Sequence, residues 1–127
     1  MTRMQPEQWN LKRLTDELAR QKPDADVRFD FAYLHPTGLI SYRGYYDQLA
    51  FTFDEESDYP TVETVLNWLR DANGKAFEGY KGGHFKMHNL TPLWVANYGN
   101  SGGTAVVGVD VRGDGADVYL QTALLDL

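Results

Sequence analysis

Aromatic and basic side chains gather in a segment of this sequence that contains no carboxylate. Residues 79–109 hold none of the 18 Asp and Glu residues, yet they hold seven of the 12 glycines. The segment also carries Tyr80, Phe85, Trp94 and Tyr98, together with two lysines and two histidines. Glycine lets backbone N–H groups approach and surround an anion, and aromatic faces stack on bases. These residue types favour a pocket for a small molecule with a flat ring and anionic groups, such as a nucleotide.

A plainer interpretation of the same segment stays open. Residues 92–97 and 104–111 are apolar and rich in β-branched side chains, which is typical of buried strands that exclude charge. Burial explains these two strands, but it explains the glycine-rich stretches beside them less readily.

A second concentration of aromatic and basic residues spans residues 42–47. Tyr42, Arg43, Tyr45 and Tyr46 place three rings and one guanidinium close together. They could form an aromatic wall with a fork that binds phosphate. Tyr and Arg are also common at subunit interfaces, and tyrosines can simply cover a sheet edge. Ligand contact and a subunit interface are compatible if the site lies between subunits.

The candidate ligand-binding residues share an aromatic face, a positive charge, or a side-chain amide or hydroxyl. They are Tyr42, Arg43, Tyr45, Tyr46, Lys81, Phe85, Lys86, Trp94, Asn97, Tyr98, Asn100, Ser101 and Arg112. In this hypothesis Lys81, Lys86 and Arg112 hold phosphates. The amides of Asn97 and Asn100 both donate and accept hydrogen bonds, so they suit a base edge or a ribose.

Patterns typical of enzymes are incomplete in this sequence. Residues 99–103 match G-x-S-x-G, but that motif needs a following helix, and residues 104–109 read as a strand. His84 and His88 lack the glutamate of a zinc-binding H-E-x-x-H motif. The acidic residues 54–58 lack the spacing of a calcium loop. We therefore expect no catalytic residue, no metal site and no cofactor.

The elements that position these residues follow from hydrophobic periodicity and capping signals. Helices are expected at 6–21 and from the N-cap Thr61 to 73, and strands at 26–31, 49–53, 92–97, 104–111 and 116–124, with a loop at 35–38. Alternation in the first strand predicts Val27, Phe29 and Phe31 inward. Short turns favour antiparallel pairing. The predicted fold class is α+β, with two helices packed on a twisted antiparallel sheet of about five to six strands.

Length, charge and composition bear on the number of domains, the possible partners and the cellular location of the protein. The chain has 127 residues, a net charge of −6 and no Cys, so one domain covering residues 1–127 without disulfides is expected. The negative charge argues against binding to duplex nucleic acid. Neither a secretory signal nor an apolar run of roughly 18–20 residues is visible, which predicts a cytoplasmic protein without membrane contact.

The layout of the chain resembles a known family. An N-terminal helix, the alternating strand 27–31, residues 42–47 and a glycine-rich C-terminal half are similar to small phage and prophage proteins of the first-described Thoeris anti-defence family. The most distinctive segments are 41–53, 77–83 and 91–103. The resemblance covers most of the chain in layout and size.

This resemblance implies a sponge, which binds a cyclic nucleotide immune signal of the cyclic ADP-ribose type and hides it without cleaving it. It also implies a homodimer or higher homo-oligomer, working in the host cytoplasm if phage-encoded. Two other function classes stay open. One is a protein-binding inhibitor or structural phage module with no small-molecule ligand. The other is a nucleotide-processing enzyme with His84 or His88 as general base.

Overall fold

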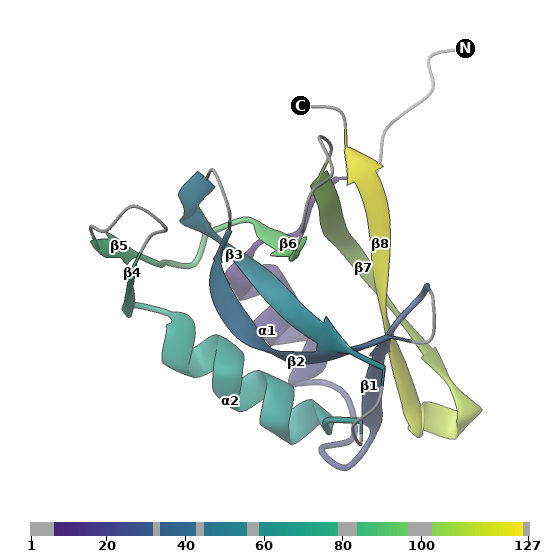
Figure 1. The fold of residues 1–127 in the computed structure, drawn as a ribbon. Coiled ribbons are helices and arrows are strands. Elements are labelled where there is room, and N and C mark those ends of the chain that lie inside the picture. The colour runs from purple at the N-terminus through teal and green to yellow at the C-terminus, as the bar shows by residue number, and fades with distance from the viewer. Residues whose placement is uncertain are drawn as a thin grey trace.

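Two helices and a curled six-stranded sheet make up most of the structure, a computed structural model that describes residues 7–31, 34–42, 45–55, 59–78, 84–96 and 103–125 (Figure 1). The helices are α1 (Leu11–Leu18) and α2 (Val62–Ala72). The six strands are β1 (Asp26–Phe29), β2 (His35–Tyr42), β3 (Tyr45–Asp54), β6 (Leu93–Val95), β7 (Gly103–Arg112) and β8 (Asp117–Leu125). The hairpin of β4 (Ala76–Glu78) and β5 (His84–Lys86) is separate, and the short helix η1 (Gly113–Gly115) joins β7 to β8.

The α+β class and the two helices are confirmed, but the predicted all-antiparallel sheet is wrong. The strand order is β1-β8-β7-β6-β3-β2, and the pairs β1–β8 and β3–β6 are parallel. Parallel neighbours need a long connection. The chain from β3 to β6 supplies one through α2 and the β4–β5 hairpin, and most of the chain separates β1 from β8. The short turns that suggested antiparallel pairing govern only hairpins such as β2–β3 and β7–β8.

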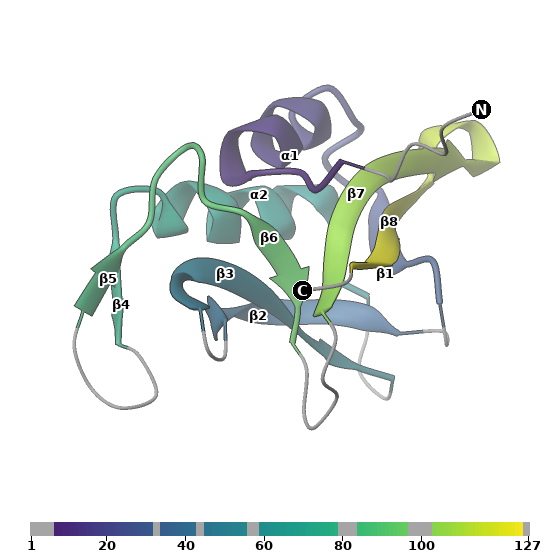
Figure 2. The ribbon, with the colours of Figure 1, turned by 90° about the horizontal axis from the view of Figure 1, so that it is seen from above.

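The sheet curls until it is nearly barrel-like. Its two end strands, β1 and β2, follow each other in the chain, and the backbone N–H of Phe29 donates to the carbonyl of Leu34 at 2.9 Å. Both helices lie on the same side of the curled sheet (Figure 2). This leaves the opposite face of β1, β8 and β7 for polar side chains.

Local signals in the sequence fix the helix ends. Asn10 caps α1 by accepting from the backbone N–H of Arg13 at 2.9 Å, so α1 begins later than the predicted residue 6. Thr61 caps α2 as predicted, accepting from Thr64 at 3.3 Å. After α2, Gly74 has φ +84°, the left-handed conformation that glycine adopts freely.

The main core lies between the helices and the sheet. It buries Leu14 and Leu18 of α1 and Val65 and Leu69 of α2, as the helical spacing predicts. It also buries residues of every strand of the large sheet except β2, of which Leu39 is partly buried against it.

The predicted inward alternation at 26–31 holds for only part of that segment. Val27 and Phe29 are buried, whereas Phe31 is 36% exposed, so its predicted inward position is wrong. The strand ends at Phe29 and the chain turns at Asp30, which carries Phe31 out of the alternating pattern.

Candidate ligand-binding site

Trp94, one of the predicted ligand-binding residues, is buried on the sheet face that points away from the helices. It packs with Ala50, Ala96 and Ala105 in a second, smaller core cluster. Its indole N–H donates to the side-chain oxygen of Gln48. The small alanines make room for the large ring, so the contacts of Trp94 among the described residues are those of a packing residue.

The structure separates the other described candidates from Trp94. Arg112 lies at the end of β7, whereas Trp94 pairs with Ala105 near the start of that strand. Seven residues of strand correspond to about 20 Å, so Arg112 and Trp94 do not share a site. Lys86 is exposed on β5, in the separate hairpin.

The remaining predicted residues lie wholly or partly outside the described part of the chain. Those outside it are Arg43, Lys81, Asn97, Tyr98, Asn100 and Ser101. For four more, the strands are described but the side chains are outside the described part: Tyr42, Tyr45, Tyr46 and Phe85. Their grouping around a ligand therefore stays a prediction.

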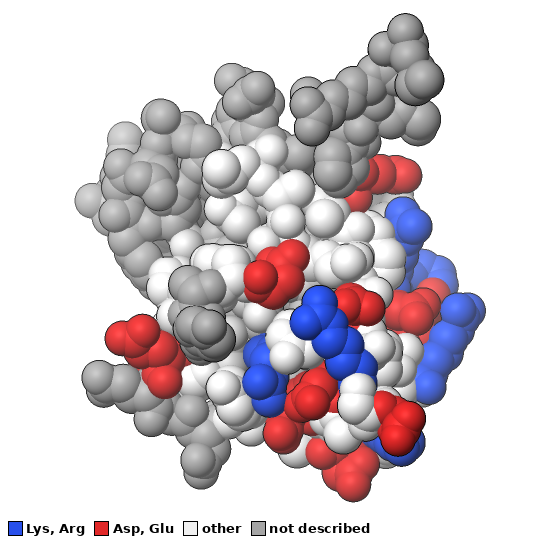
Figure 3. Space-filling view, turned by 90° about the vertical axis from the view of Figure 1, so that its right-hand side faces the viewer, with Lys and Arg blue, Asp and Glu red and all other residues white. Residues whose placement is uncertain are grey.

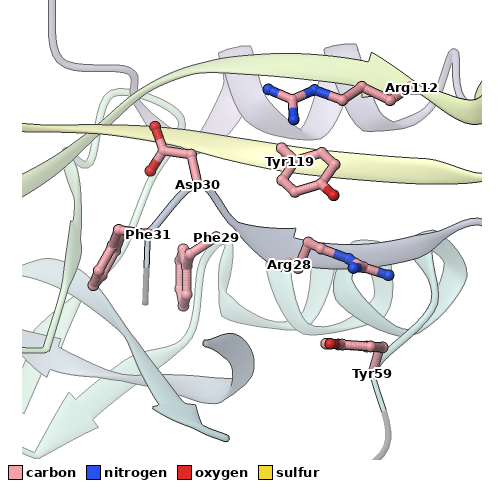
Figure 4. A pocket seen from close by; sticks show the side chains of 7 residues that line it. All are labelled: Arg28, Phe29, Asp30, Phe31, Tyr59, Arg112 and Tyr119. Carbon is pink, nitrogen blue, oxygen red and sulfur yellow. The ribbon is translucent and has the colours of Figure 1, made fainter. Parts of the chain in front are cut away.

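A cavity of about 390 Å³ lies beside Arg112. It opens where β1 ends, across the polar face of β8 and β7 (Figure 4). Phe31 and Tyr59, which are 36% and 38% exposed, offer aromatic surface at its rim. The residues that line it are Arg28, Phe29, Asp30, Phe31, Tyr59, Arg112 and Tyr119.

Strand register places the polar lining on one face of the sheet. Arg28 of β1 pairs with Tyr119 of β8, and Tyr119 pairs with Asp110 of β7. Arg112 pairs with Asp117 two residues along, and residues two apart in a strand point to the same side. The opposite side of the same strands carries the buried core, so this face is the one left to solvent.

Four side chains on this face alternate guanidinium and ring. The guanidinium carbon of Arg28 lies 4.2 Å from the ring centre of Tyr59 and 5.4 Å from that of Tyr119. The guanidinium carbon of Arg112 lies 4.4 Å from the Tyr119 ring centre. All three distances fall within the range of cation–π attraction. We call Tyr59, Arg28, Tyr119 and Arg112 the Arg–Tyr column (Figure 4).

Carboxylates hold both arginines of the column. Arg28 Nη2 lies 3.1 Å from Asp117 Oδ1, and Arg112 Nε lies 2.8 Å from Asp110 Oδ2. The hydrogen bond to Asp110 and the charge of that carboxylate raise the pKa of Arg112 above its ordinary value, so Arg112 keeps its charge at any physiological pH. Figure 3 shows the same mixture, with positive and negative side chains interspersed on this side of the molecule.

Asp30, the one carboxylate among the described residues of the cavity wall, is already engaged. Its Oδ2 accepts from the backbone N–H of Thr122 at 3.0 Å, and its Oδ1 accepts from the Thr122 hydroxyl at 2.7 Å. Each bond uses one of the lone pairs on the two carboxylate oxygens. Asp30 therefore anchors the end of β1 to β8 through Thr122.

The two guanidiniums keep donors for a bound acceptor. Asp110 engages Nε of Arg112, whose side chain is 62% exposed, so the other N–H groups of this guanidinium are left for further acceptors, of which the Tyr119 hydroxyl is one. Arg28 Nε is buried without a hydrogen-bond partner among the described residues. A buried donor without a partner is unfavourable, so this atom is a point of strain behind the wall of the cavity.

The two histidines singled out in the sequence lie away from this cavity. His84 and His88 are exposed, and His88 Nδ1 accepts from the backbone N–H of Leu90 at 3.1 Å. Within the described ranges, no three His, Cys, Asp or Glu side chains come together in a way that could hold a metal ion.

Sequence reasoning missed Arg28, Tyr59 and Tyr119. The alternation of residues 26–31 already places Arg28 opposite the core, but nothing local indicates that β8 lies beside it. Arg28 and Tyr119 become neighbours only through the parallel pairing of β1 and β8.

In the described part of the chain, neither helix has the length and apolar character needed to cross a membrane. No protein-family model matches this sequence, and neither a curated protein nor a solved structure shows significant similarity to it.

Proposed function

We propose that this chain binds a cyclic nucleotide signal and sequesters it intact, with the cavity beside the Arg–Tyr column as a binding site. The family resemblance suggests a phage anti-defence protein and a ligand of the cyclic ADP-ribose type. The observation that carries the proposal is the column itself, because two guanidiniums and two phenol rings stand in one wall of a cavity.

The chemistry of this wall suits the parts of a nucleotide. Phosphate oxygens accept from guanidinium N–H groups in charge-assisted hydrogen bonds. Bases stack on exposed aromatic rings, and Phe31 and Tyr59 supply such surface at the rim. A cavity of about 390 Å³ falls within the roughly 300–1,000 Å³ of small-molecule sites.

Binding without cleavage is supported by the contacts that the carboxylates around the cavity already make. Asp30 is occupied by Thr122, and the carboxylates of Asp110 and Asp117 are paired with arginines. In these contacts the carboxylates position Thr122, Arg112 and Arg28, which favours a role in binding over one in proton transfer. The polar groups of this wall are arranged to hold a ligand in place.

Ligand capture tests this function. The purified chain is incubated with lysate from bacteria in which a nucleotide immune signal has been induced, then washed and denatured, and the released molecules are identified by mass spectrometry. We expect an intact cyclic nucleotide, which the Arg28→Met/Arg112→Ala variant retains much less. Retention of no nucleotide, or release of a cleaved product, would contradict the proposal.

A homodimer belongs to the same proposal. Leu124 near the end of β8 is 79% exposed, which is unusual for a large apolar side chain and suits a contact between copies. Light scattering on the Leu124→Ser variant and the wild type tests it, with a dimer expected only for the wild type. A wild-type monomer with exposed Leu124 would instead favour the protein-binding inhibitor.

A further inference from the structure

The junction between α2 and the β4–β5 hairpin carries a dipeptide that can modify itself. Asn73 is the C-cap residue of α2, and Gly74 follows it before the chain enters β4 (Figure 1). A backbone nitrogen can attack the side-chain amide of a preceding asparagine. Glycine after the asparagine favours this attack, because it has no side chain in the way and lets the backbone rotate. Asn73 is exposed, so water reaches the site.

We infer that Asn73 is a latent deamidation site, which the folded chain protects and which reacts when this junction opens. The backbone nitrogen of Gly74 loses its proton and bonds to Cγ of Asn73, the Cγ–Nδ2 bond breaks, and ammonia leaves. Water then opens the succinimide ring to give aspartate or isoaspartate, and no other reactant is needed. This inference goes beyond the proposed function and does not depend on it.

The backbone conformation of Asn73 keeps the two reacting atoms apart. Its ψ angle is 118°, so the nitrogen of Gly74 points away from Cβ and therefore from the side-chain amide. The attack needs this nitrogen turned to the side of Cβ. That is a rotation of about 120° in ψ, which takes Asn73 out of both the β and the helical regions. The observed conformation is therefore unreactive.

Hydrogen bonds also hold both reacting groups. Nδ2 of Asn73, the leaving group, donates to Oδ1 of Asn89 at 2.7 Å. The backbone N–H of Gly74, the nucleophile, donates at 2.8 Å to the carbonyl of Met87, which is a buried residue. The attack requires that both bonds break while ψ rotates. Deamidation at Asn73 therefore requires a local opening of the junction.

Reaction at Asn73 prevents the junction from closing as before. Either product replaces the donating amide with a carboxylate, which at neutral pH cannot donate to Asn89. Isoaspartate also adds one carbon atom to the backbone. The added atom lies between the hydrogen bond from Asn73 to the carbonyl of Leu69 and the hydrogen bond from Gly74 to Met87. An opening that is otherwise reversible thus becomes permanent.

Peptide mapping by mass spectrometry tests the inference. The full chain is incubated at pH 8 and 37 °C, either folded or unfolded in guanidinium chloride, and deamidation is followed at Asn73 and Asn67. Asn67 is exposed on the same helix, but the bulky Trp68 follows it and slows the attack. We expect Asn73 to react much faster than Asn67 in denaturant.

In the folded chain, Asn73 should react at least about tenfold more slowly than in denaturant. A factor of ten corresponds to an opening free energy of about 1.4 kcal/mol. Equal rates at Asn73 in the two states would overturn the protection. Equal rates at Asn73 and Asn67 in denaturant would overturn the latent site itself.

A substitution at Asn89 tests the hydrogen bond to the leaving group. Asn89→Ala removes the acceptor of Nδ2, so Asn73 in the folded chain should react about twofold to tenfold faster than in the wild type. The matched control is Leu90→Ala, which shortens the neighbouring side chain, 68% exposed, and should leave the rate unchanged. An unchanged rate in Asn89→Ala, or the same increase in Leu90→Ala, would overturn protection by this bond.

Discussion

Replacing Tyr119 by Leu removes the ring that lies between the two arginines while keeping apolar bulk on β8. The contact with Arg112, at 4.4 Å, involves an exposed guanidinium and adds little to stability. The contact with Arg28, at 5.4 Å, involves a side chain only 24% exposed and is worth about 1 kcal/mol. We therefore expect Tyr119→Leu to lower the free energy of unfolding by about 1 kcal/mol.

Urea denaturation measures this loss. With a slope of about 1–3 kcal/mol per molar urea, the midpoint should fall by about 0.3–1 M. A double-mutant cycle with Arg28→Met, which keeps the length of the side chain, isolates the Arg28–Tyr119 contact. We expect a coupling energy of about 1 kcal/mol. The matched cycle uses Lys75 and Phe77, a 5.5 Å pair on the separate hairpin that should couple by less than about 0.5 kcal/mol.

Additive effects would refute the reasoning. If the effects of Tyr119→Leu and Arg28→Met on the free energy of unfolding add up to within about 0.3 kcal/mol, the two side chains are not coupled. The contact between the ring and the guanidinium then does not stabilise the protein.

Three further substitutions test the local structure. Gly115→Ala should lower the stability by about 1–2 kcal/mol in a urea titration, because φ there is +91°; an unchanged midpoint would contradict the left-handed turn. Thr61→Ala should cost about 1 kcal/mol, since it removes the N-cap bond to Thr64, and Thr61→Ser should retain most of it. Trp94→Phe should lower the stability by about 1 kcal/mol by leaving Gln48 without its donor, while nucleotide affinity at the Arg–Tyr column stays within twofold.

Elements with strong local signals could be predicted from the sequence. The helix α2 has a capping residue, one apolar face and a terminal glycine, and all of these are properties of neighbouring residues. The strands of the β7–β8 hairpin likewise follow from a β-branched run and a glycine-rich turn. Such signals need no knowledge of what lies across the fold.

The start of β2 shows how a local signal can mislead. Pro36 and Gly38 predict a loop, yet both lie within a strand that begins at His35. Among the described strands β2 is at an edge of the sheet, where proline is tolerated, and its register with β3 shifts between Pro36 and Gly38. The hairpin β4–β5 was missed for a different reason, since strands of three residues are too short to show alternation.

The candidate site depends on contacts that local patterns do not encode. Arg28 and Tyr119 are separated by most of the chain, and only the parallel register of β1 and β8 makes them neighbours. Arg112 was selected for its charge, but the ring of Tyr119 and the carboxylate of Asp110 fix the position of its guanidinium. The sequence alone does not place either residue beside it.

The central claim is that the Arg–Tyr column helps to hold a cyclic nucleotide intact. Its most direct test is isothermal titration of cyclic ADP-ribose into the wild type and into Arg112→Ala, with the ligand recovered afterwards by mass spectrometry. The account predicts saturable binding by the wild type, at least about tenfold weaker binding by the variant, and an unaltered ligand, since a charge-assisted contact is worth about 1.5–3 kcal/mol. Absence of binding, equal affinity in both proteins, or a cleaved ligand would contradict it.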